Sequence, residues 1–213
     1  MSNLIAKQVL IDGPKNYVVK IVGVIDTSDV AAAGTIGTAG VTTTGSNTIS
    51  FTAGALVPVV GQLITGASGT GTGIPAGAYV TSVISATSVT ISTAVTTGGT
   101  GWTFTGVAGA IVIADPAQVQ PTPFSACSQM ILDRVTYMVE PLLEVRLWWD
   151  ATAPVYILDF TGAGHTPDYH RFGGLTNNAG AGKTGRVLLS TQGWVASAIL
   201  NFTLTLEFRK QGT

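Results

Sequence analysis

Two groups of side chains in this chain have a spacing that could support ligand chemistry, and the first is a glycine-rich segment. Gly180–Thr184 has the sequence Gly-Ala-Gly-Lys-Thr, which is similar to the end of a phosphate-binding loop. That motif needs a further glycine at position 177, a buried strand before it and a helix after it, because helix N–H groups face the phosphate. The chain has Asn177 instead, and the apolar run after Gly185 predicts a strand. We therefore expect a loop and no nucleotide site.

The second group is His165, Asp168 and His170. Two imidazoles and one carboxylate are a ligand set for zinc or iron. A shared metal would require all three side chains to turn inward from one short loop. We expect instead that both histidines are exposed or brace the loop, and that the chain holds no metal.

The remaining candidates for catalysis are weak. Asp150 and Asp159 could form an acid–base pair, but a chain with 11 acidic residues contains such pairs by chance. There is no Gly-x-Ser-x-Gly nucleophile motif. The single cysteine, Cys127, excludes an internal disulfide and is predicted to be a small buried hydrophobic side chain. The sequence therefore predicts a chain that is not an enzyme and needs no cofactor.

The elements that position these residues are strands. From Leu200 to Arg209, apolar and polar residues alternate with a period of two, which places one face in a core. Glycine, proline and asparagine clusters, notably 162–167 and 173–185, separate the candidate strands, and no segment has the pattern of an amphipathic helix. Other strands are predicted at 17–25, 130–139, 145–149, 155–160 and 186–190. Many short strands without helices favour an antiparallel β-sandwich.

Adjacent tryptophans in one of these strands must face opposite sides. Val145 and Leu147 share a face with Trp149, so we predict that Trp149 lies in the core. Trp148 then points outward and is an interface candidate, since aromatic residues are enriched in interfaces.

The composition restricts the possible partners. Charged residues make up 10% of the 213 residues, against about 25% in a typical protein, and the net charge is −1. A balanced charge gives no basic face for nucleic acid. Mean hydropathy is +0.43, but no apolar run approaches the roughly 20 residues of a membrane helix, and the start lacks a secretory signal pattern. We expect synthesis in a cytoplasm and an assembly that covers much of the surface.

The charges are also unevenly distributed. The 85 residues from Val30 to Ala114 contain no Asp, Glu, Lys or Arg. This segment is either a polar linker or a folded module, and its β-branched residues favour the module, with strands at 48–52, 62–65, 78–84, 88–92 and 102–105. The strands at 78–84 and 88–92 are predicted to form a hairpin. We therefore predict an inserted, projecting β domain at 31–109 and a sandwich formed by 1–30 and 110–213.

Parts of both regions resemble structural proteins of tailed bacteriophages. In the charge-free segment the similar residues are Val60–Gly66, Gly71–Ser85 and Ser88–Ser92. In the remainder they are Leu10–Asn16, Trp149–Ala151 and Phe172–Gly185. The remainder is most similar to jelly-roll capsid cement proteins, also called decoration proteins. This resemblance implies a jelly-roll sandwich on the outer capsid surface of a virion, made in the host bacterial cytoplasm, in contact with the major capsid protein and with copies of itself.

The expected function is therefore structural, and two alternative functions and one question about the N-terminal segment stay open. A tail or neck component has the same sequence properties. A carbohydrate-binding adhesin would use exposed Trp102, Tyr79 or Trp148 to stack on host-surface glycans. The segment before Asp12 is either an arm laid on a neighbour or the first strand. The interface candidates are Leu4, Leu10 and Trp148, together with Gln8 and Val9 between the two leucines.

Overall fold

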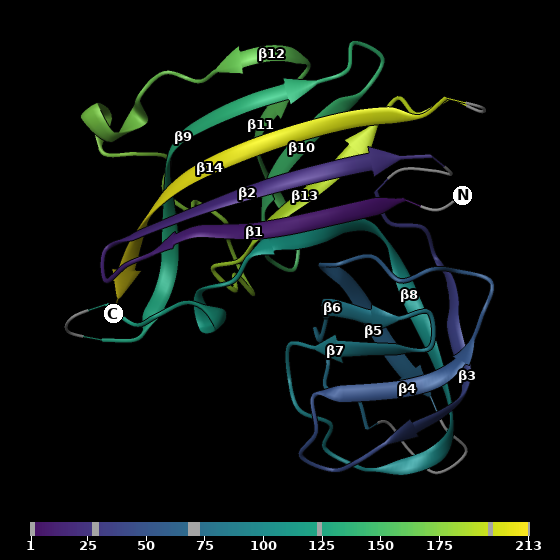
Figure 1. Ribbon diagram of the computed structural model, residues 1–213. Helices are drawn as coiled ribbons and strands as arrows, with labels where there is room; N and C mark the ends of the chain where they lie inside the picture. Colours follow the sequence, from purple (N-terminus) through teal and green to yellow (C-terminus); the bar gives the residue numbers. More distant parts are fainter. Residues whose placement is uncertain (1–2, 27–29, 68–72, 123–124, 196–197, 213) are drawn as a thin grey trace. The chain divides into compact units, whose positions relative to one another are not determined.

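The structure, a computed structural model, describes residues 3–26, 30–67, 73–122, 125–195 and 198–212. The chain divides into two compact units, shown in Figure 1. One comprises Met1–Asn3 and Thr27–Ile111, and its long segment is called the insert below. The other comprises Leu4–Asp26 and Val112–Thr213 and is called the jelly roll. The expected boundaries of the insert, 31 and 109, differ from these by at most four residues.

The jelly roll consists of two antiparallel sheets, which confirms the predicted all-β sandwich. One sheet has the order β1-β2-β14-β9-β12, and the other has the order β11-β10-β13 followed by the end of β8 (Figure 1). The strands are β1 (Leu4–Asp12), β2 (Asn16–Ile25), β8 (Gly99–Ala114), β9 (Cys127–Val139), β10 (Glu144–Trp149), β11 (Val155–Phe160), β12 (Gly162–His165), β13 (Val187–Gln192) and β14 (Leu200–Gly212). Two short 3-10 turns, η1 (Pro116–Gln118) and η2 (Tyr169–Phe172), lie in the connections.

The strand pairing is that of one long antiparallel ribbon folded over on itself. The first and last strands of the ribbon pair as β2 with β14, the next as β8 with β13, then β9 with β12, and β10 with β11 closes the end. Eight strands nested in this way and divided between two sheets are the defining connectivity of a jelly roll. The insert interrupts the ribbon between its first two strands, β2 and β8.

The core between the two sheets follows the predicted alternation. Val145, Leu147 and Trp149 are each no more than 2% exposed, which confirms the predicted orientation of the adjacent tryptophans. The rings of Tyr137 from β9 and Phe160 from β11 are 4.9 Å apart and join the two sheets. Burial of such side chains is the main stabilising term for a fold of this kind.

The segment before Asp12 is the first strand of the jelly roll. Residues of β1 pair with β2 from Leu4↔Val24 to Asp12↔Tyr17, with an irregularity in register between Val9 and Ile11. Among the residues that the structure describes, β2 is its only strand neighbour, so β1 lies at the edge of its sheet. Of the two alternatives, the strand is therefore the one that this fold contains.

Tyr17 gives the jelly roll a predicted sensitivity to alkali. Its side chain is 2% exposed, and burial, followed by the carboxylates of Asp12 and Asp115, raises its pKa to about 12. The unfolded chain releases the phenolic proton near pH 10 whereas the folded chain retains it, so stability should fall between pH 10 and 12, by up to about 1.4 kcal/mol per pH unit. Urea unfolding at pH 9 and pH 11 measures this loss. In Tyr17→Phe the loss should be smaller by this amount, and an unchanged pH dependence would contradict the prediction.

The insert is built from five short strands and the first part of β8. The short strands are β3 (Gly34–Thr42), β4 (Thr48–Ala53), β5 (Gln62–Ala67), β6 (Val80–Ser85) and β7 (Ser88–Ile91). Their order is β8-β3-β4-β7-β6, and β5 pairs with the other side of β8. An isolated bridge between Leu63 and Tyr79 brings β5 close to the start of β6. The predicted hairpin is confirmed by the pairing of β6 with β7, from Val80↔Ile91 to Ser85↔Ser88.

The insert has its own hydrophobic core, so the charge-free segment is a folded module rather than a linker. Trp102 and Phe104 stack with their rings parallel at 6.5 Å, and Phe51 meets Phe104 edge-on at 5.8 Å. The amide of Gln62 is also buried. It accepts from Val59 N at 3.2 Å and donates to Ala32 O at 2.9 Å, so it ties two connecting segments to β5.

Two strands lie where no strand was predicted. β3 contains Gly34, Gly37 and Gly40, and β12 lies in the glycine cluster that was expected to be a loop. An added Cβ at Gly37 would lie 2.3 Å from the ring of Phe51, and one at Gly40 would lie 2.2 Å from the ring of Phe104. The glycines of β3 are therefore the places where aromatic rings rest on the strand, which outweighs their low strand propensity.

Candidate functional site

The Gly180–Thr184 loop is folded against the turn after β10. Thr184 Oγ1 donates to Asp150 Oδ2 at 2.7 Å, and Thr152 N donates to Ala181 O at 3.2 Å. Gly185, with φ of +80°, leads into strand β13, which confirms the predicted strand after this loop. The loop therefore presents no helix N-terminus to a phosphate, and its threonine is engaged by Asp150.

The structure places one metal-ligand candidate, His165, in β12 and the other two, Asp168 and His170, at η2. His165 lies in β12, where it pairs with Thr136 and is exposed. Asp168 caps η2 by accepting from His170 N at 3.2 Å. His170 Nδ1 lies 3.3 Å from Asp133 Oδ2, a partner that the sequence did not suggest. Within the described ranges, no three His, Cys, Asp or Glu side chains are grouped closely enough to hold a metal ion.

Asp133 is the centre of a charged cluster on the outer face of the first sheet. It is the extra residue at an irregularity of β9, where Arg134 and Leu132 pair with consecutive residues of β14. Arg209 donates two hydrogen bonds to its carboxylate, from Nε to Oδ2 at 2.8 Å and from Nη2 to Oδ1 at 2.9 Å. Nη2 also donates to Gly173 O at 2.6 Å. The cluster therefore fixes η2 and the following glycine against β9 and β14.

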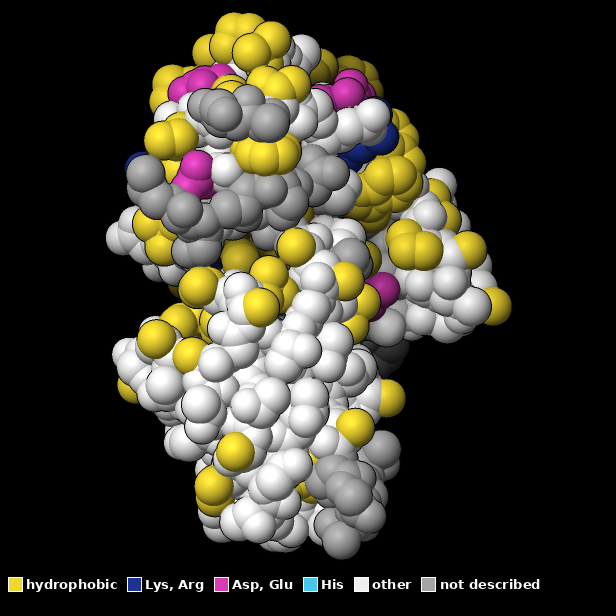
Figure 2. Space-filling view, turned by 90° about the vertical axis from the view of Figure 1, so that its right-hand side faces the viewer, with side chains coloured by type: hydrophobic (Ala, Val, Ile, Leu, Met, Phe, Trp, Pro, Cys, Tyr) yellow, Lys and Arg dark blue, Asp and Glu magenta, His cyan; other side chains and the backbone are white. Residues whose placement is uncertain are grey.

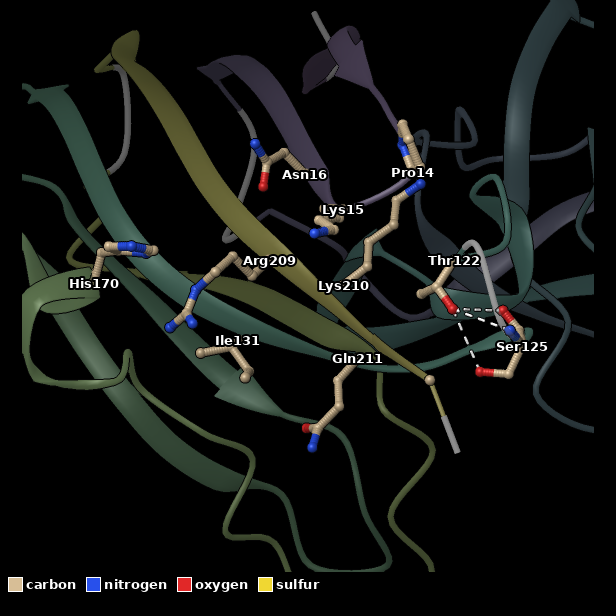
Figure 3. A pocket seen from close by; sticks show the side chains of 11 residues that line it. Pro14, Lys15, Asn16, Thr122, Ser125, Ile131, His170, Arg209, Lys210 and Gln211 are labelled. Carbon is tan, nitrogen blue, oxygen red and sulfur yellow. Dashed lines mark hydrogen bonds between the residues drawn. The ribbon is translucent and has the colours of Figure 1, made fainter.

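A cavity of about 630 Å³ lies beside this cluster (Figure 3). Its lining includes Lys15, His170, Arg209 and Lys210. Arg209 is bound by Asp133. The Lys210 ammonium, fully shielded from solvent, is bound by Asp12 and by Gln120 O at 2.8 Å. Two of the three Lys and Arg side chains are thus already neutralised by carboxylates, which leaves little charge to attract an anion. The charged cluster and the cavity are best explained by a structural role, in which these ion pairs hold the connecting segments against the end of the sandwich.

The remaining catalytic candidates are also in structural roles. Cys127 is buried as predicted, and burial raises the pKa of its thiol. Asp159 accepts a hydrogen bond from the Tyr156 hydroxyl. Burial, and then this bond, raise the pKa of Tyr156 to about 12. Asp159 is therefore paired with a phenol, and Asp150 with a threonine, rather than with each other.

Trp148 lies on the outer face of the second sheet, as expected from the burial of Trp149. Its indole N–H donates to Ser190 Oγ at 2.8 Å, and its ring meets Tyr156 edge-on at 5.6 Å. Trp148 is partly buried by these neighbours, whereas Tyr156 is 47% exposed. The surface at this point is therefore an aromatic pair rather than a single exposed tryptophan.

Two of the interface candidates, Leu4 and Leu10, lie on β1 together with other exposed apolar side chains of β1 and β2. Leu4 is 64% exposed, Ile11 51%, Leu10 46% and Val22 38%. Pairing places Leu4 beside Val24, Ala6 beside Val22 and Ile11 beside Val18. Val18, Val22 and Val24 alternate with buried residues along β2, so they face outward. The β1 residues that pair with them face outward for the same reason. We call the outward set the apolar strip: Leu4, Ala6, Leu10, Ile11, Val18, Val22 and Val24.

The aromatic residues proposed for sugar stacking in the insert are buried. Trp102 is 1% exposed and Tyr79 is 3% exposed, so the expectation that they are accessible is wrong. Trp102 is covered because it stacks on Phe104, and Tyr79 because it lies at the bridge to Leu63. On the face drawn in Figure 2, the insert shows no Lys, Arg, Asp or Glu side chain, only uncharged polar and apolar ones.

The fold defines the chain as a jelly-roll protein with a β insert. No protein-family model matches it, and no curated protein and no solved structure is significantly similar to it. Within the part of the chain that the structure describes, no helix is long and apolar enough to span a membrane.

Proposed function

We propose that this chain is a non-enzymatic structural protein of a tailed-phage virion, which decorates and cements the capsid by binding major capsid subunits. The observation that carries the proposal is the apolar strip. Its side chains lie on the outer face of a sheet whose inner face already forms a complete core. Gln8 and Lys20 pair on the same face and divide the strip into two apolar patches. Exposed apolar patches mark interaction sites in soluble proteins.

Three further features support the same role. The jelly-roll connectivity matches the resemblance to cement proteins, although this fold alone serves many functions. The low charge of the chain suits a surface that is largely covered in an assembly. Finally, polar side chains near the sites considered for ligand binding form hydrogen bonds that hold parts of the fold together. Many weak contacts across several subunits would add through multivalency, so no single deep pocket is needed.

The test is to add the purified chain to virions or capsids that lack it and to separate bound from free protein by gradient sedimentation. Quantitative mass spectrometry then counts this chain against the major capsid protein. Comparable copy numbers support decoration. A few copies per particle would place the chain in the tail or neck, and absence from particles would overturn the proposal.

A matched pair of variants tests the apolar strip. Leu4→Glu should reduce the bound copy number about tenfold, because it places a charge in the contact at a cost of about 1.4 kcal/mol or more. Leu142→Glu changes the same residue type at the same 64% exposure, but in the turn between β9 and β10, and should bind normally. If both variants bind as well as the unmodified chain, the strip is not the contact. Deleting the residues before Asp12 is less informative, because it also removes a strand of the sheet.

A further inference from the structure

The insert has an open sheet edge of a kind that folded proteins usually block. A strand at a sheet edge offers unpaired N–H and C=O groups, and charged residues or prolines commonly protect it. The two edge strands of the first jelly-roll sheet are protected in this way or are short. β1 carries Lys7 in its middle, and β12 is only four residues long. In contrast, β6 contains neither charge nor proline nor glycine, and it exposes Val83 at 39% and Ile84 at 59%.

The open part of this edge is residues 81–85. On one side β6 pairs with β7. On the other side, the bridge from Leu63 to Tyr79 and the hydrogen bond from Gly61 N to Val80 O reach only the start of the strand. Among the described residues, β7 is the only strand neighbour of β6, and every residue from 81 to 85 is exposed.

The charge distribution favours a second copy as the occupant of this edge. The insert has no charged side chain between Val30 and Ile111, so it cannot attract a charged partner strand by complementarity. For the same reason it does not repel its own copy, whereas two like-charged edges would. We propose that two copies of this chain associate by antiparallel pairing of β6 with β6 about a two-fold axis.

The geometry of this contact limits the assembly to a dimer. A two-fold contact uses the same patch on both partners, so each β6 edge is consumed and the sheet does not extend further. The register of β6 against β7 is irregular between Val80 and Ser82 and again between Val83 and Ser85. The regular centre is therefore Ser82 and Val83, and the two-fold axis is expected there. This pairing is independent of capsid binding, because it is measured on the free protein.

The first test compares two serines in the same sheet of the insert. Ser82 lies on β6, and Ser50 lies on β4, which has strand neighbours on both sides. Both serines are exposed. Light scattering after size exclusion should give about twice the 21.8 kDa chain mass for the unmodified protein and for Ser50→Lys. Ser82→Lys should give a single chain mass. The two variants add the same charge, so a difference between them reports the edge rather than the net charge.

The second test locates the axis by oxidative cross-linking. Directly opposite residues of antiparallel strands have Cα atoms about 4.5–5.5 Å apart, within the range that a disulfide can bridge. Ser82→Cys or Val83→Cys should form a covalent dimer much faster than Ser50→Cys. The natural Cys127 is buried and is present in all three variants.

Each outcome of these two tests either supports or overturns the proposed β6 dimer. A dimer that Ser82→Lys abolishes and Ser50→Lys retains, with cross-linking at residue 82 or 83, supports the proposal. A protein that stays monomeric up to about 1 mM overturns it. It is equally overturned if both lysine variants dissociate, if neither does, or if Ser50→Cys cross-links as fast as the β6 variants.

Discussion

A Phe104→Ala variant is expected to lose about 3–5 kcal/mol of the free energy that stabilises the insert. Phe104 is fully buried, between the parallel ring of Trp102 and the edge of Phe51. It also covers Gly40, which has no side chain to move into the space that would be left. The cavity would therefore persist, and cavities that do not collapse give the upper part of this range.

Segment-resolved hydrogen exchange under mild denaturant measures this effect. Amides of β3, β4 and β7 should lose protection in Phe104→Ala, since the exchange of these strands reports opening of the insert. Phe172→Ala is the control, because that ring is 83% exposed and its removal should change stability by less than about 0.5 kcal/mol. A loss below about 1 kcal/mol in Phe104→Ala would mean that the aromatic stack is not the centre of the core.

The second large effect is expected at Asp12, the carboxylate that binds Lys210. The Lys210 ammonium is fully shielded, so Asp12→Ala leaves a buried charge whose remaining partner among the described residues is the carbonyl of Gln120. Removing one partner of a buried pair costs about 3–5 kcal/mol, and the lower value applies here because Asp12 is 25% exposed. Urea unfolding at pH 7 measures the loss.

A second substitution tests the cause of that loss. Replacing Lys210 by Met removes the buried charge while keeping a long apolar side chain, and such replacements are often neutral or stabilising. The double variant Asp12→Ala/Lys210→Met should therefore be more stable than Asp12→Ala alone, a coupling that a double-mutant cycle quantifies. Equal stability of the single and double variants would show that Asp12 acts through its bonds to Gln120 N rather than through Lys210.

The elements that the sequence predicted well are those whose pattern is local. The period of two in 200–209 and the order Val145, Leu147, Trp149 each determine a buried face, and the structure confirms both. The hairpin of β6 and β7 was predictable because its turn and its strands are adjacent. These predictions depended only on neighbours within a few residues.

The misses have a common physical cause, which is contact between distant residues. β3 is a strand because rings from β4 and β8 rest on its glycines, and no property of the glycines themselves shows this. The adhesin alternative required exposed Trp102 and Tyr79, but both are buried through contacts with Phe104 and Leu63. The pairing of His170 with Asp133 likewise joins segments that the sequence separates.

The nested ribbon also sets the order in which this chain can fold during synthesis. β2 lies beside β14, with Ile25 opposite Leu200, so its second neighbour is translated long after it. At about 5–20 residues per second, β2 waits roughly ten seconds or more. In that interval β1 protects one side of β2, and the insert can complete its own core before the rest of the jelly roll exists. The other side of β2 stays open until β14 leaves the ribosome, so the nascent chain has an exposed strand edge that the folded jelly roll no longer has.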